Sequence, residues 1–174
     1  MVATMADVTL VDDVESLFRA HYGRLVRALT LACGDRELAA DAVQEAFVKA
    51  HLKWRRLQHY DDPVGWIRRV AINRMRDDHR RTTRKDRAVT RLAALTDHTV
   101  PAHEPVGEGI TALLATLPRQ QRLATALYYV DQLSVAEIAE ALGLSQGAVK
   151  FHLHQARERL RSTLAGGPDQ GGHP

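Results

Sequence analysis

The chain has 174 residues, of which 45% are hydrophobic and 26% are charged, and it contains one cysteine, Cys33. This composition is typical of one or two small globular domains, and a single thiol excludes an internal disulfide. No apolar run approaches the roughly 18 residues of a membrane span. Because Asp7, Asp12 and Asp13 interrupt any signal-peptide core, we expect a cytoplasmic protein without membrane insertion.

The net charge of +3 is unevenly distributed. Residues 53–91 hold 13 basic and 5 acidic side chains, whereas residues 92–117 hold no basic and 3 acidic ones. A block this basic indicates a surface that binds a polyanion. The alternative is a solvated helix face, which typically alternates the sign of its charges more evenly.

Two amphipathic helices are predicted first, over about residues 13–32 and 35–54, with Gly34 and Asp35 breaking the pattern between them. Phe47 belongs to the inner apolar stripe of the second helix. Asp41, Gln44 and Glu45 lie beside that stripe, at accessible positions. Spacing alone favours a solubilising role for these three polar residues.

A basic helix is predicted next, from about residue 63 to 81, with residues 55–62 as a loop before it. Asp62 followed by Pro63 is a typical helix start. One side of this helix is apolar and the other is polar; the polar side and the loop together supply His59, Tyr60, Arg69, Asn73, Arg76, Asp77 and Arg80. Cations beside aromatic rings suit single-stranded nucleic acid, because rings stack on unpaired bases while cations follow the phosphates. For each ring taken singly, core packing is the alternative.

Prolines and glycines mark residues 92–112 as a flexible linker. We therefore predict an all-α chain of two small helical domains, over 13–91 and 113–164, followed by a disordered tail over 165–174.

The C-terminal domain carries a predicted helix-turn-helix between residues 134 and 161. Ser134 and Glu137 form a capping box, Gly143 ends the first helix, and Ser145 caps the second. Gln146, Lys150 and His154 lie on the side of the second helix away from its apolar stripe. Such a helix would enter the major groove of DNA, although an ordinary helical hairpin is the alternative.

Two segments resemble one known family. Residues 117–161, LPRQQRLATALYYVDQLSVAEIAEALGLSQGAVKFHLHQARERLR, resemble region four of bacterial sigma factors of the extracytoplasmic-function type. VQEAFVKA (43–50) and PVGWIRRVAINRMRDDHRR (63–81) resemble region two of the same family. Phe151, His152 and Gln155 depart from the family pattern, which leaves the promoter sequence open.

This resemblance implies a promoter-specificity subunit that binds core RNA polymerase and promoter DNA, with an anti-sigma factor as a candidate inhibitory partner. It implies polymerase binding by Asp41, Gln44, Glu45 and Phe47. It implies recognition of the minus-ten element by the loop and basic helix named above, His59, Tyr60, Arg69, Asn73, Arg76, Asp77 and Arg80. It implies recognition of the upstream element by Ser145, Gln146, Gly147, Lys150, Phe151 and His154.

Two other classes of protein remain as alternatives. A helix-turn-helix regulator could bind DNA without being a polymerase subunit, but residues 1–112 show no strand run for the phosphoacceptor domain of a two-component effector. A small helical hydrolase is the second alternative. The chain contains no HExxH and no CxxC, and its nine histidines do not cluster at metal-ligand spacing. We therefore expect neither an enzyme nor a metal or cofactor.

Overall fold

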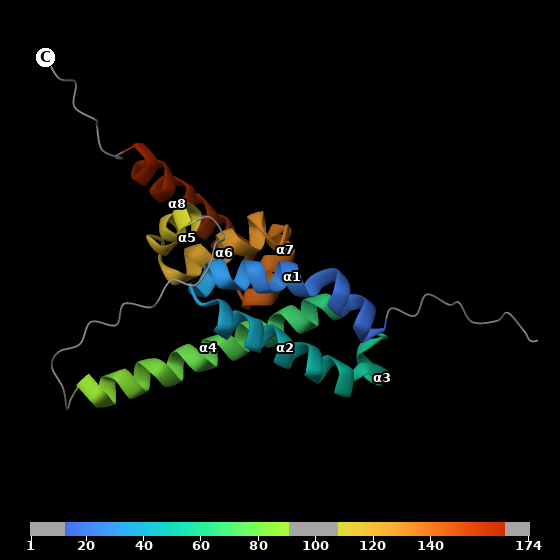
Figure 1. Ribbon diagram of the computed structural model, residues 1–174. Coiled ribbons are helices and arrows are strands. Elements are labelled where there is room, and N and C mark those ends of the chain that lie inside the picture. The colour runs from blue at the N-terminus through green and yellow to red at the C-terminus, as the bar shows by residue number, and fades with distance from the viewer. Residues whose placement is uncertain (1–12, 91–107, 166–174) are drawn as a thin grey trace, which may run out of the picture.

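The structure is a computed structural model that describes residues 13–90 and 108–165. Those two ranges contain eight α-helices and no strand, which confirms the all-α prediction. The helices are α1 (Val14–Cys33), α2 (Arg36–Leu52), α3 (Trp54–Leu57), α4 (Pro63–Thr90), α5 (Glu108–Ala115), α6 (Arg119–Tyr129), α7 (Val135–Leu142) and α8 (Gln146–Ala165) (Figure 1). Most of the predicted linker and all but the first residue of the predicted tail lie outside the described residues.

Local hydrogen bonds set the ends of the first two helices. The Asp13 carboxylate accepts from the Ser16 backbone N–H (2.7 Å) at the start of α1, and Asp35 accepts from Leu38 (3.0 Å) at the start of α2. Gly34 ends α1 in the left-handed conformation, with φ of 80°, and its N–H donates to the Thr30 carbonyl at 2.7 Å. The predicted break at Gly34 and Asp35 is therefore confirmed.

The segment between α2 and α4 corrects one prediction. Residues 55–62 were expected to form a loop, but residues 54–57 form the short helix α3. The Leu57 side chain is buried with 2% exposure, so one apolar anchor holds this turn against the core. Asp62 then caps α4 by accepting from the Gly65 N–H at 2.8 Å. A Cβ at Gly65 would collide with that same carboxyl group.

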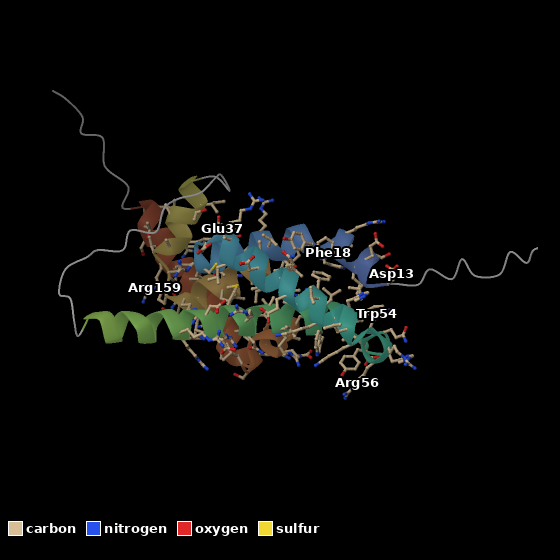
Figure 2. The ribbon with its side chains drawn as sticks, turned by 60° about the horizontal axis from the view of Figure 1, so that its bottom comes forward. Asp13, Phe18, Glu37, Trp54, Arg56 and Arg159 are labelled. Atoms are coloured by element: carbon tan, nitrogen blue, oxygen red, sulfur yellow. The ribbon has the colours of Figure 1, made fainter. Side chains whose placement is uncertain are left out.

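Helices α1, α2 and α4 enclose the core of what we call the N-terminal unit, residues 13–90. Its fully buried side chains include Leu25, Leu29, Val43, Ile67 and Ile72. Both tryptophans of the chain, Trp54 and Trp66, are half-buried in this unit. Figure 2 shows Trp54 and Arg56 near the end of the molecule where Asp13 caps α1.

Helices α5 to α8 form the C-terminal unit, residues 108–165. Its first helix begins at Glu108, inside the segment 92–112 that was expected to be a linker. The apolar spacing explains the difference, because Leu114 and Leu117 are buried against the unit and extend its packing toward the linker. Gly109, the second residue of α5, does not prevent this helix from forming.

The two units pack against each other, with α1 on α6 and α4 on α7 (Figure 1). Their buried apolar side chains form one continuous cluster. The last turns of α4 extend beyond this packed region, as Figure 1 shows. The packing brings the basic helix and the helix-turn-helix side by side.

Candidate nucleic-acid interface

The helix-turn-helix is held by the predicted caps. Ser134 and Glu137 form the capping box, with the Ser134 hydroxyl accepting at 3.2 Å and the Glu137 carboxylate at 2.8 Å. Hydrogen bonds from the Ser134 side chain and backbone to the Glu137 carboxylate lower the pKa of Glu137. Gly143 ends α7 with φ of 66°, and the Leu144 N–H donates to the Ala139 carbonyl at 2.9 Å. The Ser145 hydroxyl accepts from Ala148 N–H at 3.1 Å and so caps α8.

Helix α8 has one buried side and one accessible side. Val149, Leu153 and Ala156 are buried, as the apolar spacing predicts. The six residues expected to read the upstream element are all exposed, namely Ser145, Gln146, Gly147, Lys150, Phe151 and His154. Phe151 is 58% exposed although it is a large apolar side chain. An accessible aromatic edge beside a lysine suits apolar contact with a thymine methyl group.

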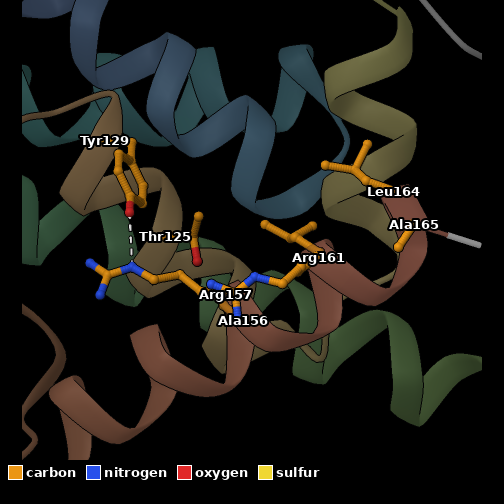
Figure 3. Close-up of a pocket in the computed structure, with 8 residues that line it drawn as sticks. Thr125, Tyr129, Ala156, Arg157, Arg161, Leu164 and Ala165 are labelled. Carbon is orange, nitrogen blue, oxygen red and sulfur yellow. Dashed lines mark hydrogen bonds between the residues drawn. The ribbon is translucent and has the colours of Figure 1, made fainter.

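Sequence reasoning missed the contacts that fix α8 on α6. The Arg157 Nε donates to the Tyr129 hydroxyl at 3.0 Å, drawn as the dashed line in Figure 3. The Arg157 guanidinium carbon lies 5.8 and 5.9 Å from the ring centres of Tyr128 and Tyr129. Tyr129 and Arg157 border a largely apolar groove of about 620 Å³ between α6 and α8, which Leu160 and Leu164 also line. The adjacent tyrosines in the sequence were a signal for such a cation–aromatic contact.

The seven residues expected to contact the minus-ten element fall into two groups. His59, Tyr60, Asn73, Asp77 and Arg80 are exposed. Arg69 and Arg76 are instead half-buried under α7. The Arg69 Nη2 donates to the Glu140 carboxylate at 2.5 Å, and Arg76 Nη2 donates to the Leu142 carbonyl at 3.3 Å. Burial, followed by the charges of Arg119 and Arg80, lowers the pKa of Arg76.

The four residues expected to bind polymerase also differ in exposure. Asp41 and Gln44 are exposed on α2, whereas Glu45 is half-buried between Lys49 (2.7 Å) and Arg74 (2.5 Å). Hydrogen bonds from Lys49 and then Arg74 lower the pKa of Glu45. Phe47 is buried, with 4% exposure, and belongs to the core that supports this face.

Two exposed apolar residues on α2 were not predicted. Val48 is 53% exposed and Leu52 is 78% exposed. They follow Gln44 at intervals of four residues, so they continue the same face of the helix. The four-residue spacing from Gln44 to Val48 and Leu52 was the sequence signal that could have predicted these two exposed side chains. We call Asp41, Gln44, Glu45, Val48 and Leu52 the α2 face.

The described residues offer neither a metal site nor a membrane-spanning helix. No group of three or more histidine, cysteine, aspartate or glutamate side chains within residues 13–90 and 108–165 could hold a metal ion. None of the helices in the described part of the chain is both long and apolar enough to cross a membrane. Cys33 is largely enclosed, and burial raises the pKa of its thiol, which disfavours the reactive thiolate.

This fold and surface define an all-helical protein with a helix-turn-helix and a basic helix packed beside it. Residues 17–85 match the family Sigma-70 region 2, and residues 108–160 match Sigma-70, region 4. The chain belongs to the RNA polymerase sigma factors of the extracytoplasmic-function (ECF) type. Both regions occur in the order that the sequence predicted.

Several curated relatives share this organisation. The ECF RNA polymerase sigma factor SigM of Mycobacterium tuberculosis is 30% identical over 152 residues, which are 86% of this chain and 76% of that protein. SigE of Mycolicibacterium smegmatis is 31% identical over 165 residues, and the chain spans 61% of its length. A solved structure of the sigma factor RpoE, in complex with the anti-sigma factor NepR from Bartonella quintana, has a TM-score of 0.74 at 19% identity. That likeness covers 91% of this chain and 100% of the solved chain, and it concerns the fold.

Proposed function

We propose that this protein joins core RNA polymerase in the cytoplasm and directs it to promoters, reading the upstream element with α8 and the minus-ten element with α4. The observation that carries this proposal is the accessible polar side of α8, held by caps at both ends of the helix-turn-helix and packed beside a basic helix. We propose the domain limits as 13–91 and 113–164, with α5 added to the second domain.

The upstream element would be read as duplex DNA. Gln146 and Lys150 occupy the first turns of α8, where a recognition helix meets base edges in the major groove. A glutamine can pair with adenine and a lysine with guanine or a phosphate. The Ser145 hydroxyl is already used as the helix cap, so its own role is to fix the N-terminus of α8 at the groove.

The minus-ten element would be read as a melted strand. Opening a duplex costs a few kcal/mol per extruded base, and a protein without a nucleotide energy source must recover that cost by binding the exposed bases. Tyr60 and His59 lie exposed on the turn before α4 and supply rings for stacking. Asn73 and Asp77 supply polar groups for the base edges, and Arg80 supplies a cation for the phosphates.

Core polymerase would bind the α2 face. The carboxylate of Asp41 and the exposed apolar side chains of Val48 and Leu52 lie along one side of α2. A partner with basic residues around an apolar groove would complement this face, because apolar anchors supply affinity and charges supply orientation. The anti-sigma partner of the structurally similar RpoE supports an inhibitory protein partner here as well.

The test is run-off transcription with purified core polymerase and genomic promoter fragments, in which the wild-type chain should produce discrete transcripts. Asn73→Ala should lower transcription from duplex promoters, and premelting the minus-ten region should restore much of it. Gln120→Ala is the matched control, because Gln120 is an exposed amide on α6 outside the proposed sites. Sequence-specific DNA binding without any stimulation of core polymerase would overturn the proposal and favour a regulator that acts alone.

A further inference from the structure

One group of arginines between the two units is neutralised by a buried carboxylate. The Asp131 side chain, which follows α6, is 1% exposed, and one of its oxygens accepts from Arg68 Nε on α4 at 2.6 Å. Its other oxygen lies 3.2 Å from Arg24 Nε on α1, close enough for charge attraction but without the geometry of a hydrogen bond. The fold therefore supplies a counter-charge where these two arginines meet.

A second group of arginines has no such carboxylate. Arg76 and Arg80 lie one turn apart on α4, and Arg119 and Arg122 lie one turn apart at the start of α6. We call these four residues the arginine cluster. The ion pairs of the described residues use other arginines, namely Arg19, Arg24, Arg68, Arg69, Arg74 and Arg161. Within the described part of the chain, the cluster therefore carries four positive charges without a paired carboxylate.

Contacts and burial bring the four guanidinium groups together. Arg76 reaches the C-terminal unit, where its Nη2 donates to the last carbonyl of α7 at 3.3 Å. Burial, and then the charges of Arg119 and Arg80, lower the pKa of Arg76. Burial also lowers the pKa of Arg119, and the charges of Arg122 and Arg80 lower it further against an opposing effect of Cys33. Charges that act on one another in this way lie near one another, at the end of α1 that carries Cys33.

The cluster also contains hydrogen-bond donors that the protein does not use. The Nε atom of Arg122 is fully enclosed and has no hydrogen-bond partner within the described residues. Helix α6 begins at Arg119 without a side-chain cap, since Pro118 precedes it. The first N–H groups of a helix lack partners within it and carry the positive end of its dipole. An anion in the cluster would receive hydrogen bonds from side chains and backbone alike.

We propose that the arginine cluster is an anion-binding site for a pyrophosphoryl group, the two linked phosphates that nucleotides and inorganic pyrophosphate share. A phosphate group carries about 1.5 to 2 negative charges near neutral pH, so two linked phosphates balance the cluster better than one. Guanidinium groups bind phosphate oxygens through paired hydrogen bonds. This site does not depend on the proposed function, because it requires neither DNA nor polymerase.

The burial of the cluster favours a compact anion over a DNA backbone. Arg76, Arg119 and Arg122 are half-buried between packed helices. The phosphates of a duplex lie on a convex surface and cannot enter such a space, whereas a small anion can. Because a ligand that binds only the folded chain stabilises it, pyrophosphate should raise the melting temperature. Arg119→Gln should abolish this rise, yet it should not destabilise the anion-free protein, because it removes repulsion between like charges.

The test is calorimetric titration of the full chain with sodium pyrophosphate, at constant ionic strength and without divalent cations. Arg76→Gln and Arg119→Gln each remove one cation, from α4 and from α6. Arg56→Gln is the matched control, because Arg56 is exposed near Asp13, at the end of α1 opposite Cys33 (Figure 2). All three substitutions change the net charge equally, so they alter nonspecific attraction for anions alike.

We expect the wild-type protein and Arg56→Gln to bind one pyrophosphate per chain with the same affinity. Arg76→Gln and Arg119→Gln should each weaken this binding about tenfold or more, because a charged hydrogen-bond donor is lost. Orthophosphate should bind about tenfold more weakly than pyrophosphate. ATP serves to identify the source of the group: tighter binding of ATP than of pyrophosphate indicates a nucleotide, and equal or weaker binding indicates the free anion.

Three results would overturn the inference. The first is an unchanged affinity for pyrophosphate in both Arg76→Gln and Arg119→Gln, with circular dichroism establishing that both variants fold. The second is equal affinity for orthophosphate and pyrophosphate, which would mean that the site does not recognise two linked phosphates. The third is displacement of pyrophosphate by a duplex of random sequence whose own binding weakens in the same two variants, which would assign the cluster to the DNA backbone.

Discussion

Gly143 shows what a single position contributes to the helix-turn-helix. Its φ of 66° is strained for any residue with a side chain, and an added Cβ would meet nothing within 4 Å. Gly143→Ala should therefore cost about 1 kcal/mol through the backbone alone. Urea unfolding followed by circular dichroism measures this cost.

A second glycine provides the control for Gly143. Gly23 lies inside α1 with helical φ, and an added Cβ there also meets nothing within 4 Å. Gly23→Ala should stabilise the protein by about 0.5–1 kcal/mol, because alanine loses less conformational entropy in a helix. Equal effects of the two substitutions would contradict the role of the left-handed turn at Gly143.

His21 should give the folded protein a pH dependence near neutrality. Its Nδ1 lies 3.1 Å from Arg24 Nη2. Burial lowers the pKa of His21, the charges of Arg24 and Arg68 lower it further, and Asp131 and Asp62 oppose them. The unfolded chain therefore binds this proton more readily than the folded chain does, so stability should decrease as pH falls below about 6.5.

The measurement is the free energy of unfolding between pH 7.5 and 5.5 for the wild-type protein and for His21→Asn. The loss on acidification should be smaller in the variant, because the group that takes up the proton has been removed. Glu45 and Glu137, whose pKa values are lowered, lose their stabilising charge only at more acidic pH. Identical pH slopes for both proteins would exclude His21 as the source.

At the scale of whole elements, α2 should bind its partner through apolar contacts as well as charge. Leu52→Ser should weaken binding to core polymerase by about 1 kcal/mol or more, because a buried leucine anchor would be lost from the interface. The melting temperature should hardly change, since Leu52 is 78% exposed in the free protein. Binding is measured by anisotropy with labelled protein and core enzyme.

His51→Ser is the matched control for the α2 face. His51 is the exposed neighbour of Leu52 and points to a different side of the helix. Its loss should leave the affinity for polymerase unchanged. If both substitutions weakened the affinity for core polymerase equally, binding would not depend on one side of α2, and the proposed α2 face would be wrong.

Two substitutions on α8 should distinguish recognition of a base from attraction to a phosphate. Gln146→Ala should relax the preference at one base pair by about 1–3 kcal/mol if the amide reads a base. Lys150→Ala should weaken binding to all sequences alike if the lysine contacts a phosphate. Binding profiles over a randomised upstream element compare the two, and Ser162→Ala, at the far end of α8, serves as the control. Unchanged profiles in both variants would exclude this helix as the reader.

The elements that the sequence predicted well have their signals within a few residues. The capping box at Ser134, the turn at Gly143 and the start of α4 after Asp62 depend on hydrogen bonds that span three or four positions. Helix α3 was missed because it rests on one buried leucine, Leu57, in a short segment without a full apolar repeat. Helix α5 begins at Glu108, before residue 113, where the C-terminal domain was predicted to start. A single buried leucine can be recognised as an anchor only when the surface on which it packs is known.

At the scale of the whole molecule, the contacts between the units were beyond the reach of sequence patterns. Arg68 and Asp131 are 63 positions apart, and neither lies in a motif that pairs them. The family resemblance assigned Arg69 and Arg76 to DNA, but it did not indicate that α7 contacts both of them. The charge and polarity of the α4 and α7 surfaces could therefore be predicted from the sequence. The contact between these two surfaces in the free protein could not.

Because both tryptophans lie in the N-terminal unit, intrinsic tryptophan fluorescence can follow the unfolding of that unit. Trp54 and Trp66 report only on the N-terminal unit, whereas circular dichroism reports on every helix. Leu127 is fully buried in the C-terminal unit, and Leu127→Ala should destabilise its surroundings by about 2–5 kcal/mol. Because the buried cluster runs through both units, this distant substitution should lower the melting midpoint of tryptophan emission together with that of the circular dichroism signal. In variants that separate the units, the two midpoints should move apart, so a single heated sample would reveal whether the halves of the molecule still unfold as one.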